Sequence, residues 1–356
     1  MRILFLSYSD YRFDGRLREL INISKQLGET ISIVKVNNPK DKRGISISRK
    51  GIIAIFSFVL KAIIYKKKYK PNIIFVDNRM GCVPLLFIRT KGIYIIQDVR
   101  ELYIISEQKN LKSKIGCIVE RIIMKRAAVI IAANKYRAQL MESEFRLKGR
   151  IVIYENIRKL EYTSETNIYE LKKKYDYIFS DDRKIFISTS GVDIKRTNDL
   201  LVKSVKQYEN EMILLMVGGG NCKDEKVIRT IIEKQNISNV YLVDKVPADE
   251  LKYLVGQSDV GIVNYGAYDT NNRLCASGKI YEFLLEGKPV ITTGNKPLKE
   301  ICDLFNVGVA GVNYKDSIKT MLCNYENYLK NAREFAQKYK VEDNNERLLN
   351  SIRTYL

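Results

Sequence analysis

The chain contains no histidine among its 356 residues, and this absence excludes several kinds of active site. A serine or cysteine nucleophile activated by histidine is excluded, and so is any metal site with a histidine ligand. The six cysteines lie far apart and form no Cys-x-x-Cys pair, which argues against a zinc site and against a secreted disulfide scaffold. We therefore expect reduced, mostly buried thiols in a cytoplasmic protein that binds no metal.

Long apolar runs are also scarce. The run near the N-terminus, within residues 2–8, is too short for a signal peptide. A second run, 51–60, is interrupted by Lys61 before it reaches the length that spans a bilayer. The chain also has no short internal repeat and no low-complexity tract. A hydrophobic content of 46% excludes disorder, and the length predicts two domains.

Positive charge is abundant, with 61 Lys and Arg against 41 Asp and Glu and a net charge of +20. Such an excess indicates an anionic partner, which could be a nucleic acid, an anionic membrane surface or a phosphorylated substrate. The charge alone selects none of the three.

Short apolar strands alternate with helices along most of the chain, which predicts an α/β fold with parallel sheets covered on both faces. We expect a first domain at 1–158, a linker at 159–183, a second domain at 184–340 and a C-terminal helix at 341–356 that packs back on the first domain. Two such halves imply a cleft between them. The expected strands are 2–8, 31–36, 73–77, 93–98, 129–133 and 151–154, then 184–190, 212–218, 240–246, 260–265, 289–293 and 307–312.

Ligands of open parallel sheets bind at the carboxyl ends of the strands, and unusual residues gather there in the second half. Ser190 and Gly191 end one strand, and Lys195-Arg196 follow them, which suits a diphosphate, although an isolated Lys-Arg pair is more often simply solvated. Gly219 and Gly220 follow the next strand and allow close approach of the backbone to a ligand.

The stretch 276–295 has the order loop, helix, glycine stop and strand. Its helix begins near Ser277-Gly278-Lys279, where the unpaired backbone N–H groups of the first turn can bind an anion. Glu282 follows three residues later, and a carboxylate can accept a hydrogen bond from each of two vicinal ribose hydroxyls. The alternative is an ordinary amphipathic helix with a solvated glutamate.

These segments, in this order, resemble the nucleotide-sugar-binding half of glycosyltransferases with the GT-B fold, in particular the large retaining group called family 4. The segment that carries the resemblance is Gly278-Lys-Ile-Tyr-Glu-Phe-Leu-Leu-Glu-Gly-Lys-Pro-Val-Ile291, which looks like the family's Lys and Glu before a Gly-x-Pro-Val strand entry. The stretch 249–265 is similar to the helix and strand that lead into the donor-sugar loop. The resemblance implies two Rossmann-like domains facing across a cleft, the first for the acceptor and the second for the nucleotide sugar.

The resemblance also implies roles for individual residues. Arg196, with Lys195 as the alternative, would face the diphosphate leaving group. From its residues, the segment 246–250 is mostly a structural helix start, although the backbone at Val246 could pair with a base edge. No metal is implied, and a UDP-sugar is the favoured donor. The expected donor-binding residues are Ser190, Gly191, Gly219, Gly220, Val246, Ser277, Gly278, Lys279, Ile280 and Glu282.

Three departures from the family pattern concern the sugar. The glutamate that commonly stands eight residues before the ribose glutamate is Leu274 here, and the arginine that often follows the glycine equivalent to Gly191 is Val192. The first-domain histidine of many members is absent. Diphosphate and ribose binding are therefore expected to be intact, whereas recognition of the donor sugar is not defined by the sequence.

The first half is expected to hold the acceptor. Asp98-Val-Arg-Glu-Leu-Tyr103 lies at the carboxyl end of a strand, so Asp98 is a candidate catalytic residue and Arg100 a candidate acceptor-side residue. Asp14, Gly15 and Arg16 form a turn after the first strand and are further acceptor-side candidates, with a capped, solvated turn as the alternative.

Residues 40–70 contain ten basic residues and one acidic residue around the apolar run 51–60. Such a helix is either a core helix beneath the sheet or one that lies partly in a membrane interface, where its lysines meet anionic headgroups.

We therefore predict a hexosyltransferase-type, retaining glycosyltransferase of cell-surface polysaccharide synthesis. It would transfer a sugar to a lipid-linked or polysaccharide acceptor, in the cytoplasm or peripherally on the inner face of the plasma membrane. A weak or inactive accessory subunit of a transferase is the first alternative. A basic nucleic-acid-binding protein is the second, and it is disfavoured because no compact basic-aromatic motif occurs.

Overall fold

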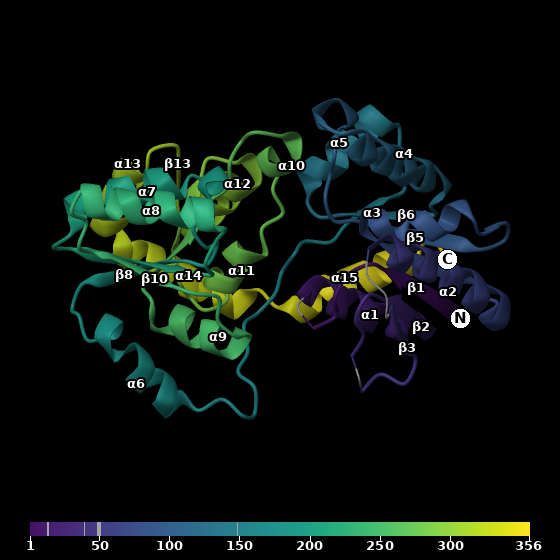
Figure 1. The fold of residues 1–356 in the computed structure, drawn as a ribbon, viewed down its shortest axis with the longest axis horizontal. Coiled ribbons are helices and arrows are strands. Elements are labelled where there is room, and N and C mark those ends of the chain that lie inside the picture. Colours follow the sequence, from purple (N-terminus) through teal and green to yellow (C-terminus); the bar gives the residue numbers. More distant parts are fainter. Residues whose placement is uncertain (13, 39, 48–50, 148) are drawn as a thin grey trace. The chain divides into compact units, whose positions relative to one another are not determined.

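The computed structural model describes residues 1–12, 14–38, 40–47, 51–147 and 149–356. The chain divides into two compact units. Unit 1 consists of Met1–Asn156 together with Glu342–Leu356, and unit 2 of Ile157–Val341. Each unit is built on its own parallel sheet with helices on both faces (Figure 1), which confirms the predicted α/β fold class.

Unit 1 contains a seven-stranded parallel sheet in the order β3-β2-β1-β4-β5-β6-β7. Its strands are β1 (Arg2–Ser7), β2 (Glu29–Val34), β3 (Gly44–Ser46), β4 (Ile73–Asp77), β5 (Tyr94–Val99), β6 (Val129–Ala132) and β7 (Ile151–Ile153). Its helices are α1 (Gly15–Leu27), α2 (Gly51–Tyr69), α3 (Asn78–Gly81), η1 (Val83–Leu86), η2 (Ile105–Glu107), α4 (Leu111–Arg126), α5 (Lys135–Phe145) and α15 (Val341–Arg353).

The core of unit 1 has two layers, one on each face of its sheet, because successive side chains of a strand point to opposite faces. On one face of the sheet, α1 and α15 pack together through residues such as Leu20 and Leu348. On the other face, α2, η1, α4 and α5 cover Leu4, Leu6 and Ile74. Successive strand residues point to opposite faces, so the fully apolar strands supply both layers.

Unit 2 contains a six-stranded parallel sheet in the order β10-β9-β8-β11-β12-β13. Its strands are β8 (Lys184–Ser188), β9 (Met212–Val217), β10 (Val240–Val243), β11 (Val260–Val263), β12 (Val290–Thr293) and β13 (Gly308–Gly311). Its helices are α6 (Ile168–Phe179), η3 (Ile194–Arg196), α7 (Asn198–Val205), η4 (Lys206–Tyr208), α8 (Cys222–Lys234), α9 (Ala248–Gln257), α10 (Thr270–Arg273), α11 (Gly278–Leu284), α12 (Lys296–Phe305), α13 (Tyr314–Cys323) and α14 (Tyr325–Lys338).

The structure differs from the sequence expectations in three places. The stretch 159–183, expected as a linker, contains α6, whose Tyr175 and Ile178 are buried in the core of unit 2. The short strand β3 was not expected. The long helical tail is three helices, of which α15 belongs to unit 1. A helix was expected near residues 49–66. Residues 49 and 50 lie outside the described residues, and the described part of this helix is α2.

No helix in the described part of the chain combines the length and the apolarity that crossing a membrane requires.

Candidate functional site

Two strand exits of unit 2 pack against each other at the carboxyl edge of the sheet. Gly191 follows β8 with a φ of 68° and Gly219 follows β9 with a φ of 60°. The Val192 amide donates to the Gly219 carbonyl at 2.9 Å, and a Cβ on Gly191 would lie 2.0 Å from that oxygen. Only glycine fits at Gly191, because its left-handed backbone and this contact both exclude a side chain. The two exits therefore present backbone rather than side chains at the edge.

Buried amides hold the first of these exits in place. Ser190 Oγ donates to Asn264 Oδ1 at 2.9 Å, and Asn264 Nδ2 donates to Asn198 Oδ1 at 2.7 Å. Asn198 Nδ2 donates in turn to the carbonyls of Gly191, at 2.9 Å, and Asp193, at 3.0 Å. Sequence reasoning missed Asn198 and Asn264 as site residues, because a lone asparagine at the start of a helix or the end of a strand carries no distinctive signal.

Three cations converge beside this exit. Lys279 Nζ donates to the Thr189 carbonyl at 2.5 Å and to Thr189 Oγ1 at 2.9 Å. The pKa of Lys279 is lowered to about 8, chiefly by burial; Glu282 opposes this shift, and Arg158 and Arg196 add smaller decreases. Arg196 donates through Nη1 to the Asn264 carbonyl at 3.3 Å and stacks over the Tyr265 ring. Lys279 and Glu282 lie three residues apart on α11, so both side chains belong to the same edge of unit 2.

Glu282 is the buried carboxylate of the same neighbourhood. It lies on α11, is only 5% exposed, and its Oε1 is 2.5 Å from Arg158 Nε. Arg158 was not expected, because it lies far from Glu282 in the sequence and nothing in its local pattern indicates a partner. Glu282 is thus an ion-paired side chain in the core edge of unit 2, and the solvated glutamate of the alternative interpretation does not occur.

The remaining expected donor-side residues lie around this cluster. Ser277 and Gly278 are buried where α11 begins, and Ser277 Oγ has no hydrogen-bond partner among the described residues. Ile280 packs in the core, so its side chain is not available to a ligand. Val246 packs against the same core, which leaves its backbone as the available part. Lys195 is exposed, beside the half-buried Arg196.

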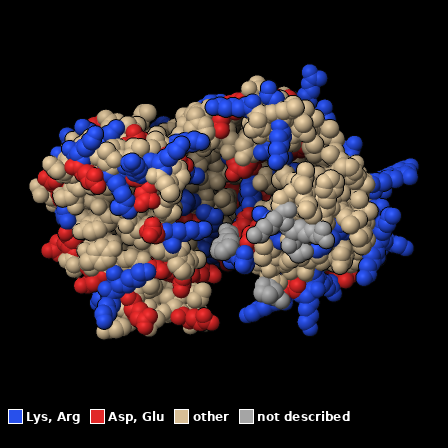
Figure 2. All heavy atoms as spheres, in the orientation of Figure 1, with Lys and Arg blue, Asp and Glu red and all other residues tan. Residues whose placement is uncertain are grey.

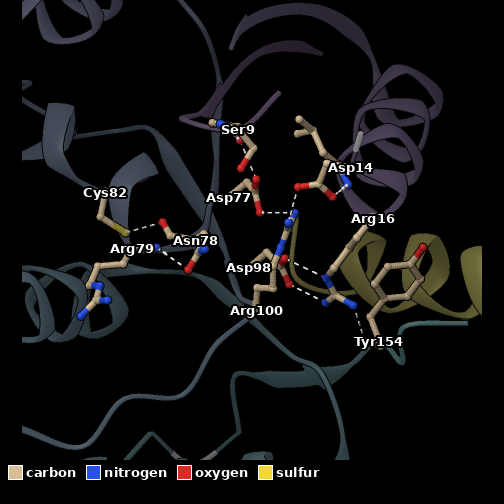
Figure 3. Close-up of polar contacts among 12 residues, drawn as sticks. Ser9, Asp14, Arg16, Asp77, Asn78, Arg79, Cys82, Asp98, Arg100 and Tyr154 are labelled. Carbon is tan, nitrogen blue, oxygen red and sulfur yellow. Dashed lines mark hydrogen bonds and ion pairs between the residues drawn. The ribbon is translucent and has the colours of Figure 1, made fainter. Parts of the chain in front are cut away.

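The charged acceptor-side candidates of unit 1 belong to an ion-pair network in two parts (Figure 3). Arg16 Nε and Nη2 donate to the two carboxylate oxygens of Asp98, at 2.9 and 2.6 Å, and Arg16 Nη1 donates to the Tyr154 carbonyl at 3.0 Å. Both side chains of the pair are almost fully buried. Burial lowers the pKa of Arg16, but Asp98 more than offsets this, and the net shift is upward.

Arg100 holds the second part of this network, which contains two further carboxylates. Its Nη2 donates to Asp77 Oδ1 at 3.0 Å and its Nη1 to Asp14, while Ser7 Oγ donates to Asp77 Oδ2 at 2.6 Å. Burial raises the pKa of Asp77 to about 6, and Arg100 opposes that rise. Asp14 also caps α1 through the Leu17 amide, and Gly15 is the first residue of that helix.

This network changes the interpretation of Asp98. Both oxygens of its carboxylate are occupied by Arg16, and the side chain is fully buried, so it has no oxygen for a substrate in this arrangement. A catalytic contact by Asp98 is therefore not favoured. Its geometry is that of a positioning residue, which fixes Arg16 beneath the turn of Asp14 and Gly15. The partly exposed groups of the network are Asp14 and Arg100.

Comparisons with known proteins bear on the fold. No family model matches the chain, and no curated protein matches it in sequence. Among solved structures, the chain is similar to sucrose-phosphate synthase from Thermosynechococcus elongatus, with a TM-score of 0.77, 16% identity and coverage of 99% of this chain and 98% of that chain. It is also similar to HepE of Anabaena in complex with UDP-glucose, with a TM-score of 0.74, 14% identity and coverage of 99% of this chain and 100% of that chain. A third similar structure is WaaG, a glycosyltransferase involved in lipopolysaccharide biosynthesis, with a TM-score of 0.70, 13% identity and coverage of 98% of this chain and 99% of that chain.

Each of these likenesses extends over nearly the whole of both chains, while the identities are low. They therefore establish the fold and leave the activity to the residues of the site. The chain has the two-unit α/β architecture of glycosyltransferases with the GT-B fold.

Proposed function

We propose that the chain is a glycosyltransferase that transfers a hexosyl group from a nucleoside diphosphate donor with retention of the anomeric configuration. The observation that carries the proposal is the cluster of Lys279, Arg196 and Arg158 around the buried Glu282, at the edge of the sheet in unit 2. Three cations against Glu282 and Asp193, which lies 4.0 Å from Arg196, leave the cluster with excess positive charge, which suits a diphosphate. A UDP-sugar is the favoured donor, and the UDP-glucose bound by HepE of Anabaena supports that choice.

The cations would act on the leaving group. Negative charge grows on the diphosphate as the glycosidic bond breaks, so preorganised donors lower the barrier most where that charge appears. Arg196 is held by Asn264 and Tyr265 and is partly exposed, and Lys195 lies beside it. Lys279 donates to the backbone and hydroxyl of Thr189, two acceptors that a phosphate oxygen could replace. This chemistry requires neither a metal nor a histidine base.

Glu282 would accept hydrogen bonds from the ribose hydroxyls. The ion pair with Arg158 restrains the buried carboxylate in one orientation. When a ribose binds, Arg158 either keeps its contact with the Glu282 carboxylate alongside the ribose hydroxyls or moves to contact the phosphates. In both cases Arg158 belongs to the donor site.

Unit 1 would bind the acceptor, through the partly exposed Asp14 and Arg100. We propose a lipid-linked or polysaccharide acceptor in cell-surface polysaccharide synthesis, and a peripheral position on the inner face of the plasma membrane. The involvement of WaaG in lipopolysaccharide biosynthesis supports this choice. Nucleic acid is not proposed as a partner, because the sequence contains no compact basic-aromatic motif.

The second candidate function is that of an accessory subunit with weak or no activity. The residue that favours this second function is Leu274. A leucine cannot make the polar contact with the sugar that a glutamate makes at this position in the family pattern. The two candidates share nucleotide binding and differ in turnover.

Isothermal titration with UDP-glucose, UDP, GDP-mannose and dTDP-glucose tests donor binding. We expect UDP-glucose to bind and Glu282→Gln to weaken it by about 1–3 kcal/mol, the range for loss of a charged acceptor. Glu233→Gln, at an exposed position of α8, is the matched control and should bind as the wild type does. The proposal fails if no nucleotide binds or if Glu282→Gln binds equally well. If UDP-glucose binds but no UDP is released when cell extracts that contain acceptors are added, the result favours the accessory subunit over the active transferase.

A further inference from the structure

The outward face of α2 is apolar. Its buried side is narrow, consisting of Ala54, Phe58 and Ala62, while Phe56 on the opposite side is 70% exposed. The exposed apolar residues recur about every fourth position and form one stripe along the helix. They are Ile52, Ile53, Phe56, Leu60 and Ile64.

A second apolar stripe faces outward on α4. Leu111, Ile115, Ile118 and Ile122 are spaced four, three and four residues apart, which places them on one side of the helix. All four are exposed, and Leu111 is 73% exposed. The opposite side of α4, with Ile123 and Met124, supplies the core. The helix is therefore apolar on two sides, and the outward one has no core to cover.

The 3-10 turn η1 joins these two stripes. It packs against both α2 and α4, and the exposed side chains of Leu86 and Phe87 lie at its end. The three elements cover the same face of the sheet of unit 1, with Leu85 and Ile88 in its core. The stripes of α2 and α4 and the end of η1 thus form one surface, here called the α2–η1–α4 face.

Basic residues border the α2–η1–α4 face, and exposed acidic residues do not occur on its described elements. Figure 2 shows an uncharged area on this unit from which Lys and Arg side chains project at the border. Glu120 is the acidic residue of α4, and it is buried, while α2 has none. The exposed basic residues of these elements and of the segment after η1 are Lys67, Lys68, Arg89, Lys91, Lys112, Lys114, Lys125 and Arg126.

We propose that the α2–η1–α4 face docks unit 1 on an anionic lipid membrane. The apolar side chains would enter the boundary between headgroups and acyl chains, and the lysines and arginines at the border would meet anionic headgroups. No helix has to cross the bilayer, because the residues involved lie side by side on one face. The inference rests on the peripheral membrane position of the proposed function and adds the surface that docks. Lipid binding is measured without nucleotide, so its failure is distinguishable from a failure of donor binding.

A second copy of the chain is the competing occupant. In a two-fold dimer the same patch would face itself, which brings the basic borders of both copies together without acidic partners. Like charges across an interface oppose association, whereas an anionic surface complements them. The charge of the border therefore favours lipid over a second copy.

Flotation of the full chain with vesicles tests the proposal. The vesicles contain phosphatidylcholine alone or with rising phosphatidylglycerol, at low and high salt. We expect binding to rise with the anionic lipid and to fall with salt. Lys66, Lys67 and Lys68 changed together to Glu should lower the partition coefficient about a hundredfold or more, the factor that corresponds to about 1 kcal/mol for each of the three lysines near the surface. Phe56→Ser with Phe87→Ser should lower it on all vesicles.

Matched controls come from unit 2. Leu304→Ser changes a residue that is 69% exposed and lies outside the face, and Lys226 and Lys234 changed to Glu reverse charges on α8. These variants should float as the wild type does, and all variants should keep its melting temperature. Equal flotation of face and control variants overturns the proposal. So does a wild-type dimer, seen by analytical ultracentrifugation, that Phe56→Ser with Phe87→Ser converts to a monomer while flotation stays unchanged.

Discussion

Lys279 is the residue at which charge and function are most closely linked. Its pKa is lowered to about 8, chiefly by burial, so the side chain loses its proton within an accessible pH range. In the proposed function a diphosphate lies beside it, where it would favour the protonated form and raise that pKa in the complex. Binding and proton uptake are therefore coupled above the pKa of the free protein.

This coupling predicts how donor affinity depends on pH. The affinity for UDP-glucose should be constant from pH 6.5 to about 8 and then fall, by up to about tenfold for each pH unit. Titration calorimetry from pH 6.5 to 9 measures it. Lys279→Met should bind more weakly and show a flat profile, and Lys234→Met, at an exposed position of α8, should retain the wild-type profile. A fall of equal size in Lys279→Met would show that another group titrates.

Local spacing explains which site residues the sequence could predict. Lys279 and Glu282 are three residues apart on one helix, so their neighbourhood follows from helix geometry alone. Arg158 reaches Glu282 only through the fold of unit 2. The pairing of Asp98 with Arg16 likewise joins the ends of two elements of unit 1. Such long-range contacts leave no periodic trace in the sequence, and Asp98 therefore looked available to a substrate.

At the scale of elements, most strands were predictable because they are buried on both faces and therefore continuously apolar. Helix α6 was not predicted, because only Tyr175 and Ile178 are buried and its other positions are rich in lysine and tyrosine. Strand β3 has three residues, too few for a periodic pattern. The glycine-rich exits were predicted as backbone sites, but their contact with each other appears only in the sheet.

That contact yields a prediction for Gly191→Ala. The alanine Cβ would lie 2.0 Å from the Gly219 carbonyl oxygen, at a φ of 68° that disfavours any side chain. We expect a loss of about 2–4 kcal/mol in the free energy of unfolding, from backbone strain and overpacking together. UDP-glucose binding should weaken as well, because the exits of β8 and β9 must separate.

Urea unfolding of the purified variants measures the loss. Gly256→Ala is the control, since a Cβ there meets nothing within 4 Å and the residue lies inside α9. It should be neutral or stabilise by up to about 1 kcal/mol. Equal stability of both variants would mean that the β8 and β9 exits are looser than the contact indicates.

At the scale of the whole molecule, the chain returns to its first unit at the end. Helix α15 follows unit 2 in the sequence but completes the core of unit 1, where Leu348 is fully buried with Leu17 and Leu20. Tyr154 donates through its hydroxyl to Asn345 Oδ1 at 2.6 Å, and Asn344 Nδ2 donates to the Glu155 carbonyl at 3.0 Å. Unit 1 is therefore incomplete until the last residues of the chain are present.

This arrangement predicts a selective effect of Leu348→Ala. The cavity it leaves should cost unit 1 about 2–5 kcal/mol, the usual range for a buried leucine. Unit 2 should keep its affinity for UDP-glucose, because Leu348 packs in a core of unit 1 that contains no residue of unit 2. Hydrogen exchange resolved by peptide measures the stability of each unit, and calorimetry measures binding. Leu304→Ala, on the exposed side of α12, should change neither quantity. If Leu348→Ala lowered protection equally in both units, they would unfold as one cooperative body, and the closing helix would stabilise the donor site as well.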